Sequence, residues 1–148
     1  MSRFITDLQV KELSEASFSE RGSWELLSPL VYESDVAKTI ICVPKGFKTD
    51  FASIPRLPFV FWILGDRYRK PAVIHDYLYG THELTREEAD GVLFEASKCV
   101  DVEWENKYCS AHWYDRVWIV CKKNASWLRR GSMWVGLRLF GWTHWGKE

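Results

Sequence analysis

The first 45 residues alternate short runs of strand-forming residues with turn-forming residues. The runs at residues 24–32 and 36–43 have the composition of strands, and Pro44 with Gly46 predicts a turn after the second run. The next segment, residues 47–56, is dense in turn and capping residues and is predicted to be an ordered loop. The N-terminal part is therefore predicted to form a small antiparallel sheet.

From residue 71 the apolar positions change to a helical period. Pro71 suits the first position of a helix because its missing N–H would have no partner there, and Gly80 suits the end of that helix. A second helix is predicted to start at Thr85, which forms with Glu88 the pattern of a capping box. The apolar stripe of this helix consists of Ala89, Val92, Leu93 and Ala96.

Two further helices are predicted, over residues 105–123 and 126–140. A chain of 148 residues has the length of one domain. We expect a single domain over residues 1–148 that is β-rich over about 1–56 and helical over about 57–148. The predicted fold class is α+β, a small N-terminal antiparallel sheet followed by about four packed helices.

Composition adds a division of charge to this picture. Hydrophobic residues make up 47% of the chain, which excludes an intrinsically disordered chain, and the net charge of zero gives no argument for nucleic-acid binding. Residues 1–105 carry 12 basic and 18 acidic side chains, whereas residues 106–148 carry 8 basic and 2 acidic ones and six of the nine tryptophans. For residues 127–145 three alternatives are open: ordinary packing, contact with a partner protein, and contact with a membrane surface.

The cysteines and the apolar segments indicate the compartment. No metal-ligand spacing links the four cysteines, which are Cys42, Cys99, Cys109 and Cys121. The first ten residues form no apolar signal segment, and no apolar run approaches the roughly 20 residues that cross a bilayer. We expect a cytoplasmic protein with reduced thiols.

A polar cluster between residues 50 and 90 is the candidate site, and it has three interpretations. Its members are Asp50, Ser53, Arg56, His75, Asp76, Glu88 and Asp90. In the first interpretation a divalent metal ion, held by His75, Asp76 and Asp90, activates a water for hydrolysis. Asp50 would then be a fourth ligand or a general base.

The other two interpretations need no metal. In the second, a carboxylate orients the imidazole of His75, which activates the hydroxyl of Ser53 as a nucleophile. The Gly-x-Ser-x-Gly pattern that usually exposes such a serine is missing. In the third, the cluster is structural: Asp50 and Ser53 cap turns, Arg56 pairs with a carboxylate, and His75 is a hydrogen-bonded core histidine.

Three segments of the chain resemble one known family. They are VPKGFKTDFASIPR at residues 43–56, KPAVIHDYLYG at residues 70–80 and TREEADGVLFEA at residues 85–96. In this order they are similar to the pattern of a bacteriophage and bacterial family, domain of unknown function 1353. The positions that match are Thr49, Asp50, Ser53, Pro55, Arg56, His75, Asp76, Tyr79, Glu88, Ala89 and Asp90. Phe51 departs from the pattern, since a small residue, often glycine, tends to follow the Thr–Asp pair. The resemblance implies a phage or prophage setting and no mechanism.

Two functions are carried forward. The leading hypothesis is a small hydrolase-like phage protein with a divalent metal ion as its candidate cofactor. Its candidate catalytic residues are His75, Asp76, Asp50 and Ser53. Its candidate substrate-binding residues are Arg56 and Tyr79, and its candidate metal ligands are His75, Asp76 and Asp90. The alternative is a non-enzymatic phage accessory or virion-associated protein that binds a phage or host partner through its tryptophan-rich C-terminal half. Both functions are expected in the cytoplasm of the host cell, the second also on the virion.

Overall fold

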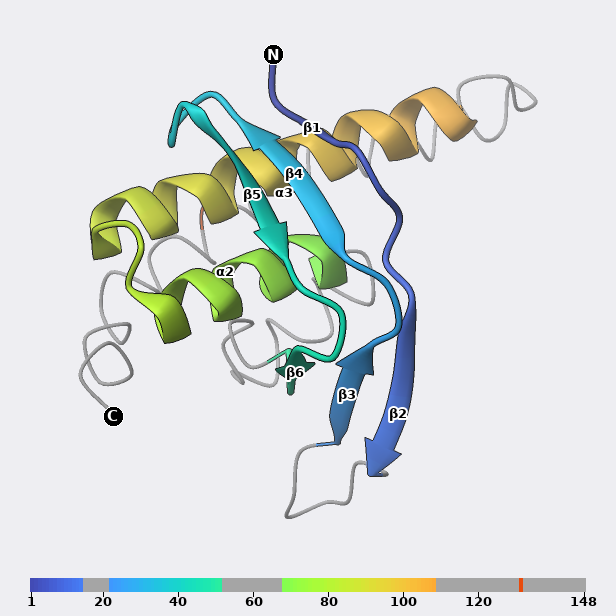
Figure 1. Ribbon diagram of the computed structural model, residues 1–148. Helices are drawn as coiled ribbons and strands as arrows, with labels where there is room; N and C mark the ends of the chain where they lie inside the picture. The colour runs from blue at the N-terminus through green and yellow to red at the C-terminus, as the bar shows by residue number, and fades with distance from the viewer. Residues whose placement is uncertain (15–21, 52–67, 109–130, 132–148) are drawn as a thin grey trace.

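The computed structural model describes residues 1–14, 22–51, 68–108 and 131 of the chain. Within these residues the chain forms six strands and two helices (Figure 1). The strands are β1 (Arg3–Phe4), β2 (Val10–Ser14), β3 (Ser23–Leu26), β4 (Leu30–Ser34), β5 (Thr39–Val43) and β6 (Lys48–Thr49). The helices are α2 (Arg69–Thr81) and α3 (Arg86–Tyr108).

The strands form two antiparallel sheets of three strands each. The first has the order β1-β4-β5 and the second the order β2-β3-β6. The first sheet packs against both helices, since α2 contacts β5 and α3 contacts β1 and β4. In the second sheet, β2 and β3 extend away from the helices, whereas β6 lies beside α2 (Figure 1).

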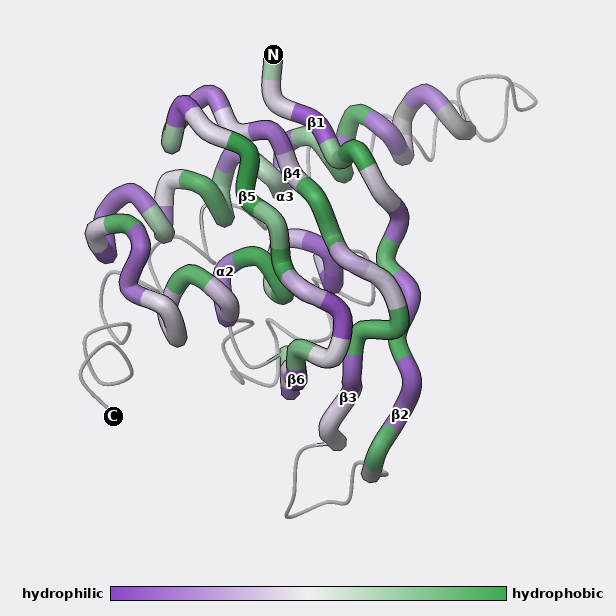
Figure 2. The backbone as a smooth tube through the Cα atoms, viewed as in Figure 1, coloured by the Kyte–Doolittle hydropathy of each residue, from purple (hydrophilic) through white to green (hydrophobic). Residues whose placement is uncertain are grey.

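The core lies between the first sheet and the helices because the apolar residues of β4 and β5 alternate. Leu30 and Tyr32 of β4 and Ile41 and Val43 of β5 point inward and are buried. From the helices the core takes Val73, Ile74, Leu78, Ala89, Val92 and Ala96. Figure 2 shows hydrophobic stretches along β4, β5 and α2, and residues of these three elements belong to one cluster of buried side chains. Burying one large side chain of this kind contributes about 1.5–3 kcal/mol.

The helix ends agree with local signals to within a few residues. The predicted capping box is present, because the Thr85 N–H donates to Glu88 Oε2 at 2.9 Å and the Glu88 N–H donates to Thr85 Oγ1 at 3.3 Å. The predicted limits of α2 were wrong at both ends. The helix begins at Arg69, two residues before Pro71, and it continues through Gly80 to Thr81. His82 ends it in the left-handed conformation, with its N–H donating to the Leu78 carbonyl at 3.0 Å.

The predicted fold class, a small sheet followed by about four helices, was wrong. Within the described residues there are two sheets and two helices. The run at residues 24–32 was predicted as one strand, but it forms parts of two. Residues 27–29 are not in a strand, and β3 before them and β4 after them belong to different sheets. Residues 105–108 continue α3 rather than starting a helix, since no proline or glycine between residues 92 and 108 ends it. The remainder of the predicted helices, apart from Gly131, lies outside the described residues.

No helix within the described part of the chain combines the length and the apolar character needed to cross a membrane.

Candidate functional site

The structure brings His75 of α2 and Asp90 of α3 into direct contact. His75 Nε2 lies 3.1 Å from Asp90 Oδ1, and the two residues are each 2% exposed. Tyr79, one helical turn after His75, donates its hydroxyl to the same oxygen at 2.7 Å. The His75 and Tyr79 rings also contact each other, with centroids 4.0 Å apart. The predicted substrate-binding residue Tyr79 is thus a partner of Asp90.

The surroundings of Asp90 favour its charged form. Burial by itself raises the pKa of this carboxyl, but the hydrogen bonds from His75 and Tyr79 and the nearby Arg86 charge lower the pKa below its usual value. Arg86 Nε lies 3.9 Å from Asp90 Oδ2, one turn earlier on the same helix. For Tyr79, burial and the hydrogen bond to Asp90 raise the pKa of the phenol. An ionised Asp90 accepts only, so the hydrogen on His75 lies on Nε2 in this contact.

Asp76 belongs to a different contact from its neighbour His75. Its Oδ2 accepts a 2.6 Å hydrogen bond from the Thr49 hydroxyl of β6, and the Thr49 oxygen accepts from the Phe51 N–H at 3.0 Å. Adjacent residues of a helix point about 100° apart, so the two side chains reach different neighbours. Asp76 therefore ties α2 to the end of β6, while His75 ties α2 to α3.

Phe51, directly after Asp50, has an unusual backbone conformation. Its φ of 52° lies in the left-handed region, which is unfavourable for a bulky residue and easy for glycine. This conformation gives a physical reason for the small residue that the family pattern often has here. The Phe51 ring packs against Trp24 with centroids 4.9 Å apart, and the guanidinium carbon of Arg69 lies 5.5 Å from the ring centroid. Asp50 itself is partly buried.

The other predicted site residues are placed as follows. Ser53 and Arg56 lie outside the described residues. The candidate metal ligands fall into two separate contacts, His75 with Asp90 and Asp76 with Thr49. Among the residues that the structure describes, no group of three His, Cys, Asp or Glu side chains could hold a metal ion.

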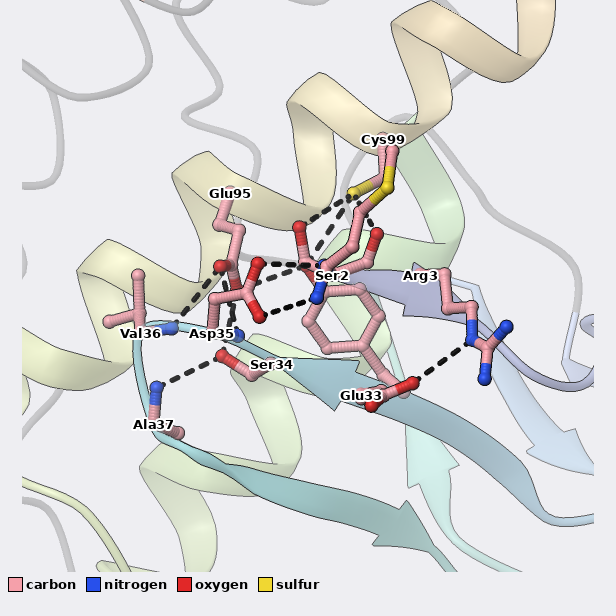
Figure 3. Close-up of polar contacts among 11 residues, drawn as sticks. Ser2, Arg3, Glu33, Ser34, Asp35, Val36, Ala37, Glu95 and Cys99 are labelled. Atoms are coloured by element: carbon pink, nitrogen blue, oxygen red, sulfur yellow. Dashed lines mark hydrogen bonds and ion pairs between the residues drawn. The ribbon is translucent and has the colours of Figure 1, made fainter.

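Sequence reasoning missed Glu95 of α3, which accepts four hydrogen bonds from the β4–β5 hairpin (Figure 3). Its Oε1 accepts from the backbone N–H groups of Asp35 and Val36 at 3.1 and 3.2 Å. Its Oε2 accepts from the hydroxyls of Ser34 and Tyr32 at 2.7 and 3.1 Å. One signal in the sequence could have indicated this contact. Glu95 directly precedes Ala96 of the apolar stripe, so its side chain lies next to the helix face that packs on the sheet.

Cys99, one turn further along α3, extends this network towards the N-terminal segment (Figure 3). Its sulfur lies 3.4 Å from the Ser2 hydroxyl and 3.7 Å from the Tyr32 hydroxyl. The Ser2 N–H donates to Asp35 Oδ2 at 2.8 Å. The segment before β1 is thereby attached both to α3 and to the hairpin turn.

The model of a family described as "Protein of unknown function (DUF1353)" matches residues 24–112. Comparison with curated proteins and with solved structures gave no match.

Proposed function

We propose that this chain, which belongs to the DUF1353 family of proteins of unknown function, is a non-enzymatic binding protein whose family motifs hold the fold together. The observation that carries the proposal is the burial of His75 and Asp90 against each other, with 2% of each residue exposed. A catalytic acid or base must reach its substrate directly or through one water. Side chains with so little exposed surface offer poor access to a substrate.

The motif contacts support a structural role because they join the three segments to one another. Thr49, from residues 43–56, bonds to Asp76, from residues 70–80. His75 and Tyr79 of that segment bond to Asp90, from residues 85–96. These bonds use Asp90 Oδ1, whereas the buried Asp90 Oδ2 forms no hydrogen bond with a described residue and faces the Arg86 guanidinium at 3.9 Å. A buried polar network favours one arrangement of its elements through the bonds that its members do form. These residues thus have a role that needs no substrate.

The binding role is supported by the sequence of residues 106–148. This region carries six tryptophans and a net charge of +6, the difference between 8 basic and 2 acidic side chains. Tryptophan and arginine are the side chains most enriched at the energetic centres of protein interfaces. An acidic surface on a partner protein would complement the region. The resemblance to phage proteins supports an accessory or virion-associated setting for such a partner.

The experiment compares three variants by urea denaturation, namely His75→Ala, Asp90→Asn and the matched surface control Glu87→Gln. Leaving a buried group without its hydrogen-bond partner costs about 1–3 kcal/mol, and more when that group is charged, so we expect the first two to lose about 2 kcal/mol or more in the free energy of unfolding. The control changes an exposed carboxylate of the same helix, and we expect a change within about 0.5 kcal/mol.

A small hydrolase is the second candidate, and one observation favours it. The hydrogen bond between Asp90 and His75 Nε2 is the contact by which a carboxylate orients a general base. Under this candidate, His75→Ala and Asp90→Asn would leave the free energy of unfolding within about 1 kcal/mol of the parent. They would also abolish Zn²⁺ or Mn²⁺ uptake measured by titration calorimetry on the full chain. That combined result would overturn the structural proposal.

A further inference from the structure

The outer edge of β5 is a surface that none of the contacts described above uses. β5 ends the sheet β1-β4-β5, and no described strand pairs with its other side. It lies at the margin of the sheet in Figure 1. An edge strand presents backbone N–H and C=O groups, and an extended segment of another chain can pair with them.

The register shows which backbone groups of β5 point outward. Val31 of β4 directs its backbone towards β1, since its N–H donates to Thr6 Oγ1 at 2.8 Å and its carbonyl accepts from the Ile5 N–H at 2.9 Å. Val31 lies opposite Cys42, so these two residues form a pair without mutual hydrogen bonds. By the alternation of an antiparallel ladder, Cys42 and Ile40 direct their N–H and C=O groups away from β4. No described residue forms a hydrogen bond with these groups.

The side chains of the same two residues are also accessible. Ile40 is 60% exposed and Cys42 is exposed, whereas Ile41 and Val43 between and after them point into the core. Val36, in the turn before β5, is 44% exposed. The edge therefore offers a short apolar face beside its open backbone groups.

Two lysines flank this edge in the sequence. Lys38 precedes β5 and Lys45 follows it, and neither forms an ion pair with a described residue. The acidic side chains of the same hairpin are already engaged. Glu33 pairs with Arg3 at 3.0 Å, and Asp35 accepts from the Ser2 N–H at 2.8 Å. The two lysines thus stand at either end of the open edge, and neither forms an ion pair with the described residues there. Two acidic side chains lie in the same region: Glu25 Oε1 lies 3.7 Å from the position of a Cβ on Gly46, beside Lys45, and Glu83 accepts from Tyr77, which is close enough to Cys42 for the two to interact.

From these observations we infer that the β5 edge binds an extended segment of a partner protein, with an apolar centre and acidic residues at both ends. The segment would pair with the backbone of Ile40 and Cys42, and its acidic residues would lie near Lys38 and Lys45. Main-chain bonds supply affinity in such pairing, and the charges select the partner. This inference does not depend on the role of residues 106–148 or on the His75–Asp90 contact.

Charge disfavours two other occupants. A second copy pairing antiparallel about Ile41 would place Lys38 opposite Pro44 of the other copy, next to its Lys45, so that like charges approach at both ends. The C-terminal region of the chain, residues 106–148, is itself basic and does not complement the lysines.

The test measures fluorescence anisotropy of two labelled, end-blocked peptides, EEVTVTVEE and KKVTVTVKK, added to the full chain. A single exposed ion pair contributes about 0.5 kcal/mol. Exchanging attraction for repulsion at both lysines therefore predicts a difference of about 2 kcal/mol, or about a thirtyfold preference for the acidic peptide. Chemical shifts of the Ile40 and Cys42 amides are expected to change on its addition. Equal binding of the two peptides, or no binding of either, would overturn the inference.

Variants separate backbone pairing from general attraction. Ile40→Pro removes an outward N–H that no described residue uses, and we expect it to weaken binding of the acidic peptide at least tenfold. Ile40→Val keeps this N–H, and its affinity for the acidic peptide should stay within twofold of the parent. The double variant Lys38→Glu, Lys45→Glu is expected to prefer the basic peptide, with Lys11→Glu on β2 as its control. These charge variants keep the test valid if Ile40→Pro unfolds. Unchanged affinity in a folded Ile40→Pro, or a dimer in sedimentation velocity that Ile40→Pro abolishes, would refute the proposed occupant.

Discussion

Replacing Glu95 tests whether one carboxylate holds the β4–β5 hairpin against α3. In Glu95→Ala all four hydrogen bonds to the hairpin are lost, but water can replace the carboxylate at the backbone N–H groups of Asp35 and Val36, which are exposed. Tyr32 and Ser34 are only 0% and 3% exposed, so water poorly replaces the carboxylate as acceptor for their hydroxyl hydrogens. The Ser34 oxygen still accepts from the Ala37 N–H at 3.0 Å, and the Tyr32 hydroxyl keeps only a 3.7 Å contact with the Cys99 sulfur, a weak acceptor. Leaving a buried polar group unsatisfied costs about 1–3 kcal/mol, so two such groups predict a loss of about 4 kcal/mol.

The isosteric variant Glu95→Gln refines this estimate. Glutamine keeps the side-chain volume and one acceptor oxygen, which can serve either the two backbone N–H groups or the two hydroxyls. A hydrogen bond to a charged group contributes about 1.5–3 kcal/mol and one to a neutral group about 0.5–1.5 kcal/mol. Weakening two bonds by about 1 kcal/mol each predicts a loss of about 2 kcal/mol, half that of the alanine variant.

The assay is urea denaturation followed by tryptophan fluorescence, with Glu103→Gln as the control. Glu103 lies on the same helix, its side chain is 51% exposed, and it forms an ion pair with Lys70 at 3.6 Å. An exposed pair of this kind contributes about 0–1 kcal/mol. If both Glu95 variants lose no more than the control, the carboxylate does not hold the hairpin and the estimate is wrong.

Three further predictions concern single positions. Phe51 has a φ of 52°, and only glycine adopts this left-handed conformation without strain. Thermal melts should therefore show Phe51→Gly about 1 kcal/mol more stable than Phe51→Ala, the reverse of the usual order of stability. The usual order would contradict the strain. Thr85→Ala removes the hydroxyl that caps α3, and urea denaturation should show a loss of about 1 kcal/mol in the free energy of unfolding. Thr85→Ser keeps the hydroxyl and should retain most of that stability. An equal loss in both variants would exclude the hydroxyl contact. Folding lowers the pKa of Asp90, so ionised Asp90 stabilises the folded state. This stabilisation is complete above pH 3.8, the ordinary pKa of the group, and is lost as the pH falls through the lower pKa of the folded state. Urea midpoints measured from pH 6 to pH 2.5 should therefore fall more steeply in the parent than in Asp90→Asn, and parallel curves would contradict this assignment.

The sequence by itself determined the features that depend on neighbours a few residues apart. The capping box of Thr85 and Glu88 needs only a spacing of three residues, and it was predicted correctly. The presence of α2 and of the apolar stripe of α3 followed in the same way from a helical period. The family was also readable from the sequence, because three segments in order carry its pattern and the family model matches residues 24–112.

Only the tertiary structure decided which distant groups meet. The His75–Asp90 bond spans 15 residues and the Ser34–Glu95 bond spans 61, and no local pattern encodes either distance. The division of residues 24–32 between two sheets has the same origin, since β3 and β4 are similar in composition and differ in the strands that pair with them. Polar side chains find their partners through the packing of sheet and helices, and that packing depends on the whole core rather than on any one segment.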